Sequence, residues 1–225
     1  MGQAIGQILS PAVGVALSPV PIIAVNLMLV TSRARVSGPA FVVGWLVGLA
    51  IVGTIVLLLA GPARPGSGGK PALWLSLLKF GLGGLLLLVA LRQWRGRPRR
   101  EDEPPVPKWT GAIESFSPAK AAAAGALMAG ANPKNTLLAV AAAASIAATG
   151  IAGADQAVAY AVFAVVGSVG VAAPVVVYFA MGDRAEPKLE RLKHWMIENN
   201  TVVMAVLLVV LGAKLIGDAI SGLSG

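Results

Sequence analysis

Six long apolar runs, separated by short polar segments, dominate the pattern of this chain. They lie at approximately residues 5–30, 39–60, 73–91, 118–148, 156–181 and 201–220. Each run is close to or longer than the roughly 20 residues that an α-helix needs to cross a bilayer. Helices satisfy their own backbone hydrogen bonds in lipid. The pattern therefore predicts an all-α polytopic membrane protein with six transmembrane helices.

Three of these runs contain proline where a regular helix is expected, including Pro174 in the fifth, and two of them combine proline with polar residues. The first carries Ser18-Pro19-Val20-Pro21, followed by Asn26, and the fourth carries Asn132-Pro133-Lys134-Asn135. Proline removes a backbone donor and clashes with the preceding turn, so helices 1 and 4 should break. Lys134 adds a charge that costs roughly 2.5–3.5 kcal/mol at the centre of a membrane helix. Such groups are tolerated where they face protein or a water-filled cavity, so both breaks are candidate functional sites.

The polar segments divide the chain into two halves. Residues 1–91 hold three spans, residues 92–117 form a Pro-rich linker with basic and acidic residues, and residues 118–225 hold three more spans. An odd number of spans in each half means that the second half enters the membrane upside down. Each half opens with a broken helix, and inverted repeats with matched broken helices place a transport site at the membrane midplane. We therefore predict a 3+3 inverted-topology repeat.

Basic residues predict the orientation. Arginines and lysines follow the first, third and fifth runs, whereas the loop at residues 149–155 has none and the loop at 61–72 has only Arg64 and Lys70. The positive-inside rule places the basic loops in the cytoplasm and both termini outside.

Composition narrows the class further. The chain of 225 residues is 56% hydrophobic and has a net charge of +8, a single histidine and no cysteine. Because the positive charge is concentrated in the loops, it indicates membrane topology rather than nucleic-acid binding. We expect no metal site and no cofactor. The sequence has no Ser/His/Asp arrangement, no carboxylate pair within a span and no phosphate-binding glycine loop, so we predict that the protein is not an enzyme.

The proline-rich break, the Asn-Pro-Lys motif and the 3+3 organisation resemble the lysine exporter (LysE) superfamily. Within it, the whole chain resembles the GAP family, the peptidoglycolipid-addressing proteins of actinobacteria, which include a sulfolipid-addressing member. Amino-acid exporters of the superfamily usually have Pro-Gly-Pro in the first motif, where this chain has Val20 between two prolines. The resemblance implies a multi-pass protein of the bacterial inner (cytoplasmic) membrane that moves glycolipids or other envelope lipids.

The residues at the breaks suit an anionic ligand. Helix N-termini and Lys134 favour a phosphate, sulfate or carboxylate group. Asn26, Asn132 and Asn135 would supply amide donors and acceptors. The simpler interpretation is that Lys134 only satisfies backbone carbonyls freed by Pro133.

Three functions stay open at this point. The leading one is a transporter of glycolipid or envelope lipid with an anionic headgroup, using Ser18, Pro19, Pro21 and Asn26 with the Asn132–Asn135 quartet. The alternatives are an exporter of amino acids or other small solutes, and a non-transporting accessory scaffold. Candidate partners are membrane lipids, lipid-export machinery and a second copy of this chain, which would bind through the small-xxx-small motif at Gly44 and Gly48.

Overall fold

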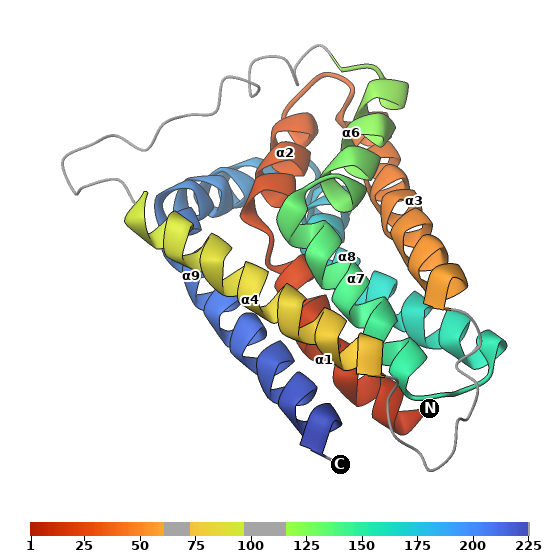
Figure 1. The fold of residues 1–225 in the computed structure, drawn as a ribbon. Helices are drawn as coiled ribbons and strands as arrows, with labels where there is room; N and C mark the ends of the chain where they lie inside the picture. The colour runs from red at the N-terminus through yellow and green to blue at the C-terminus, as the bar shows by residue number, and fades with distance from the viewer. Residues whose placement is uncertain (61–72, 97–115, 225) are drawn as a thin grey trace.

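The computed structural model describes residues 1–60, 73–96 and 116–224, and every regular element in these ranges is a helix (Figure 1). The first half contains α1 (Gly2–Ala16), α2 (Pro19–Leu29), α3 (Ala34–Ala60) and α4 (Leu73–Arg95). The second contains α6 (Pro118–Gly130), α7 (Pro133–Ala148), α8 (Gly153–Met181), the 3-10 helix η1 (Gly182–Ala185) and α9 (Glu186–Ser224). The predicted all-α class is confirmed.

Four helices are long and apolar enough to cross a membrane. They contain the spans Ala34–Leu59, Ser76–Arg95, Gly153–Met181 and Thr201–Leu223. The helices α1 and α2 add a fifth span if the pair, which is bent by 51° at its break, counts as one. At 13 and 16 residues, α6 and α7 are each shorter than a span. The described residues therefore form a multi-pass membrane protein with four or five spans, and the sixth span stays a prediction.

The helix ends differ from the predicted boundaries at several places; α3, for example, begins at Ala34, five residues before the predicted start at residue 39. The helix α4 continues to Arg95, four residues into the predicted linker, and α9 begins at Glu186, well before the predicted start at residue 201. An ion pair between Lys193 and Glu190, three residues apart, stabilises this early part of α9. Arg64, Lys70 and residues 97–115 of the predicted linker lie outside the described residues.

The helices α3 and α6 approach so closely that only small residues fit between them. A Cβ atom on Gly44 would collide with the backbone of Ala122, and one on Gly125 would collide with the backbone carbonyl of Phe41. Small residues allow this close approach of helix backbones in membranes. Because α6 also covers Gly48, the small-xxx-small face predicted for a homodimer is filled within the chain. A dimer would have to use another surface.

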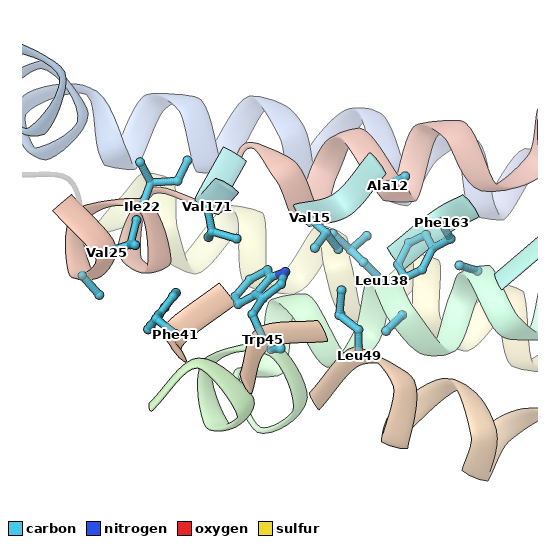
Figure 2. Packing of buried hydrophobic residues seen from close by; sticks show 14 of the residues in the cluster. Ala12, Val15, Ile22, Val25, Phe41, Trp45, Leu49, Leu138, Phe163 and Val171 are labelled. Carbon is cyan, nitrogen blue, oxygen red and sulfur yellow. The ribbon is translucent and has the colours of Figure 1, made fainter. Parts of the chain in front are cut away.

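The helix α7 lies at the centre of the packing. All but one of the residues from Leu138 to Ala147 are buried, and α7 contacts α1, α3, α4 and α8. Figure 2 shows Leu138 in the cluster that includes Val15 of α1, Leu49 of α3 and Phe163 of α8. A helix that is apolar on every face lies either in a protein core or in a membrane, and α7 is of the first kind. The run of alanines in α7 favours helix and keeps its diameter small.

The helices of the two halves are interleaved. The first helix of each half packs on the long helix of the other half, α1 on α8 and α6 on α3. Likewise α2 packs on α9 and α7 on α4, while α3 contacts α8 and α4 contacts α9. The first break is buried at Ser18 and Pro19. At the second break Ala131 and Pro133 are exposed, and burial begins with Lys134 and Asn135.

Candidate functional site

The chain is interrupted at both predicted positions, and the backbone has nearly the same conformation at each. Ser18 precedes Pro19 with φ −78° and ψ 108°, and Asn132 precedes Pro133 with φ −72° and ψ 118°. The proline ring imposes this extended conformation on the residue before it. Each proline is then the first residue of a new helix, where its missing N–H is not needed. Each break thus creates a new helix N-terminus partway along an apolar run.

Polar side chains next to the second break satisfy the backbone groups that the break leaves free. The Asn135 amide donates a hydrogen bond of 2.9 Å to the carbonyl of Met128, and the Thr136 hydroxyl donates one of 2.7 Å to the carbonyl of Gly130. These carbonyls belong to the last turn of α6, where the helix has no N–H donors of its own for them. The kink is therefore stabilised without the ammonium group of Lys134.

Lys134 is buried and has a poor partner. Its side chain is 4% exposed, and its Nζ atom lies 3.6 Å from the sulfur of Met204 on α9. Thioether sulfur is a weak acceptor. Across the described part of the chain, Lys134 forms no ion pair with a carboxylate and its ammonium donates to no backbone carbonyl. Its own backbone N–H is capped by Asn132 Oδ1 at 3.1 Å. The simpler interpretation, a lysine that satisfies the kink's carbonyls, is therefore wrong.

The two breaks lie at the same level of the bundle. Gly14 of α1 packs against the side chains of Leu138 on α7 and Leu211 on α9. Figure 1 shows that α1 and α7 run antiparallel. Ser18 lies about one turn after Gly14, and Lys134 lies about one turn before Leu138. Because the two helices are antiparallel, both residues lie on the same side of this contact along the bundle axis. The N-termini of α2 and α7 are consequently neighbours in depth.

Asn26 lies at a different depth. It is eight residues beyond Ser18, which corresponds to about 12 Å along α2 at the usual rise of an α-helix. Asn26 is 1% exposed, and both polar atoms of its amide are without a hydrogen-bond partner. The Oδ1 atom of Asn135 is also buried without a partner. The structure thus keeps Asn26 and Lys134 inside the bundle, but it does not bring them to one level.

Sequence reasoning missed two contributors to this region. Thr136 and Met204 contact the break and the lysine, and the indole N–H of Trp45 is fully buried without a partner. Figure 2 shows Trp45 in the centre of the apolar cluster. Thr136 was detectable, because a threonine four residues after a helix N-cap often bonds back to the backbone. No sequence signal identified Met204, because it contacts Lys134 across 70 positions.

An apolar groove of about 400 Å³ lies between α4 and α9, on the outer surface of the bundle. Its walls include Leu87, Leu91 and Trp94 of α4 and Val206, Val209 and Val210 of α9. Ala205 also lines the groove and follows Met204, the residue that contacts Lys134. The helix α9 therefore separates an outward-facing apolar groove from the buried cation.

The described ranges contain no group of three or more His, Asp or Glu side chains that could hold a metal ion. In comparisons with known proteins, a family model described as SfLAP (Sap, sulfolipid-1-addressing protein) matches residues 8–221. No curated protein and no solved structure matches the chain.

Proposed function

This chain belongs to the sulfolipid-1-addressing protein family, and from that premise we propose that it is an integral membrane transporter for an envelope lipid with an anionic headgroup. In this proposal the headgroup crosses the membrane past the two helix breaks, and the lipid tails stay in the bilayer. The substrate class follows from the family description together with the chemistry of the breaks.

The observation that carries the proposal is that Lys134 is buried and, among the described residues, has no carboxylate or carbonyl partner for its ammonium group. A buried cation with only a thioether neighbour, in the first turn of α7, is an arrangement that an anion would stabilise. The hydrogen bonds of Asn135 and Thr136 already stabilise the kink. The charge of Lys134 is therefore not needed to stabilise the break, and binding of an anionic ligand would explain why it is there.

The matched helix contacts support the proposed architecture of six spans in a 3+3 inverted repeat. In this architecture α1 with α2 and α6 with α7 are the two broken spans. A two-fold relation between the halves would produce reciprocal contacts, such as α1 with α8 and α6 with α3, and these contacts are present. The equal backbone angles at Ser18 and Asn132 fit the same relation. In such repeats the substrate site lies where the halves meet.

The groove between α4 and α9 favours a lipid over a small solute. It opens on the side of the bundle, and its walls are apolar. An exporter of amino acids would need an aqueous path closed to lipid, whereas a lipid transporter needs a surface that accepts acyl chains. Movement of α9 relative to α4 would join this groove to Lys134.

A specific observation also favours a second candidate, the accessory scaffold of a lipid-export machine. Lys134 is closely packed, and the central helix α7 is almost entirely enclosed. A protein that only holds other components together needs no cavity at this position. The two functions differ in whether the purified protein moves lipid by itself.

Reconstitution tests the proposal directly. Purified protein in liposomes should increase the rate at which a labelled sulfated or phosphorylated glycolipid reaches the opposite leaflet, and it should not release labelled basic amino acids. Lys134→Met should abolish the effect, while Lys188→Met, which removes an exposed lysine, should not. Lipid movement equal to that of protein-free liposomes would exclude the transporter and leave the scaffold.

A further inference from the structure

A second basic site lies at one end of the bundle, where three segments that are far apart in the sequence meet. A cavity of about 450 Å³ is lined by Ser32, Arg33, Arg35 and Val36 at the turn between α2 and α3, by Pro118 at the start of α6 and by Tyr178 near the end of α8. This end carries the polypeptide segments that the sequence predicts to be cytoplasmic. The cavity therefore lies at the level where membrane spans end, well away from Lys134.

Two helix N-termini are directed toward this cavity. The 27-residue helix α3 begins at Ala34, and the 13-residue helix α6 begins at Pro118. Neither has an acidic residue in its first turn, and both have a basic one there, Arg35 and Lys120. Helix N-termini carry a partial positive charge, so a basic residue in the first turn is unfavourable. The cavity is thus lined by two arginines and lies next to two helix N-termini, and none of the described residues that line it is acidic.

The arginines also lack counter-ions. Among the described side chains, the ion pairs join Lys193 and His194 to Glu190 and Lys214 to Asp218, and neither Arg33 nor Arg35 takes part in one. The carboxylate of Glu186 lines a separate cavity of about 170 Å³, which shares only the Tyr178 wall with the basic one.

A buried hydroxyl near the cavity is also unpartnered. Ser37 lies in the first turn of α3, next to Val36, and is 1% exposed, although it does not line the cavity itself. Its Oγ atom has no hydrogen-bond partner.

We propose that this cavity binds the sulfate or phosphate monoester of a ligand at the membrane surface. Two guanidinium groups can grip a tetrahedral anion with paired hydrogen bonds, and the Ser32 hydroxyl can add another. The apolar walls beside these donors are formed by Val36, Pro118 and the ring of Tyr178. Such walls suit an ester with an apolar alcohol part, such as a lipid. Lys134 does not line this cavity. The proposal can therefore be tested independently of the transport proposal.

The experiment compares a lipid with a free anion on the full chain in detergent. Isothermal titration would use short-chain phosphatidic acid and a short-chain sulfated glycolipid in one arm, and inorganic sulfate and phosphate in the other. Arg33→Ala/Arg35→Ala should weaken binding about tenfold or more, the loss expected for a charge-assisted hydrogen bond. Arg33→Lys/Arg35→Lys keeps the charge but loses the paired geometry, so it should fall between wild type and the alanine variant.

The matched control removes two exposed charges elsewhere at the same end of the bundle. Lys188→Ala/Arg191→Ala on α9 should leave the affinity within about twofold, because these residues do not line the cavity. Tighter binding of lipids than of inorganic anions would identify a headgroup site, and equal binding would identify a site for the free anion. The proposal is overturned if wild type binds neither class, or if the control variant loses as much affinity as the arginine variant. Binding that survives Lys134→Met would show that the two sites are separate.

Discussion

Replacing Lys134 with methionine should make this protein more stable and less active. Lys134 is buried, and its ammonium group has only the sulfur of Met204 as a neighbour. Methionine is unbranched and flexible enough to follow the path of the lysine side chain. The substitution also leaves the backbone N–H of residue 134 available to Asn132, so the cap at the break is kept.

The size of the effect follows from the cost of the buried charge. A lysine at the centre of a membrane helix costs roughly 2.5–3.5 kcal/mol on insertion scales. Loss of the contact with Met204 and local repacking offset part of this gain, so we expect a net stabilisation of about 1–3 kcal/mol. For a chain of 150–250 residues, 1 kcal/mol corresponds to about 2–4 °C, so the melting temperature should rise by about 2–12 °C.

The assay pairs thermal unfolding in detergent, followed by intrinsic tryptophan fluorescence, with lipid translocation in liposomes. Lys188→Met is the matched control, because Lys188 is exposed on α9 and its loss should change stability by no more than about 0.5 kcal/mol. A melting temperature below wild type would refute the reasoning, since it would mean that Lys134 stabilises the break. A more stable variant that still moves lipid at the wild-type rate would refute the assignment of Lys134 to the transport site.

Three further predictions concern packing, the break and orientation. Gly44→Val should destabilise the protein by about 1–3 kcal/mol or more, because the added atoms collide with the backbone of α6. The control is Gly81→Ala, whose added methyl group has no neighbouring atom within 4 Å. This control should be neutral or slightly stabilising. Asn135→Ala should cost about 1–3 kcal/mol, because the carbonyl that it caps becomes an unpaired buried acceptor. The chain has no cysteine, so a cysteine at Ala152 should react with an impermeant maleimide on intact cells, and one at Ser32 only after permeabilisation.

Each of these predictions has a contrary result. Equal melting temperatures for the two glycine variants would contradict the close crossing of α3 and α6. An Asn135→Ala variant as stable as wild type would mean that water or another donor satisfies the carbonyl. Labelling of the Ser32 cysteine on intact cells, with none at Ala152, would invert the predicted orientation.

Much of the local structure was predictable because its causes are local. Pro19 and Pro133 begin new helices, as the steric restriction on adjacent residues predicts, whereas Pro11 and Pro174 lie inside the continuous helices α1 and α8. The long apolar runs require helices in a membrane. The small residues at Gly44 and Gly48 indicated close packing, but their partner could not be read from the motif, because any helix with small residues would serve.

The sequence by itself determined a helical, multi-pass membrane protein, the positions of the two breaks and the presence of a costly charge at Lys134. Only the tertiary structure decided that Asn135 and Thr136 stabilise the kink, that Met204 is the lysine's neighbour and that Asn26 lies at another depth. It also brought Arg33 and Arg35 beside the start of α6. The physical reason is that proline sterics and hydrophobicity act between neighbouring residues or with the solvent. The partner of a buried polar group, in contrast, depends on how helices from distant parts of the chain pack together.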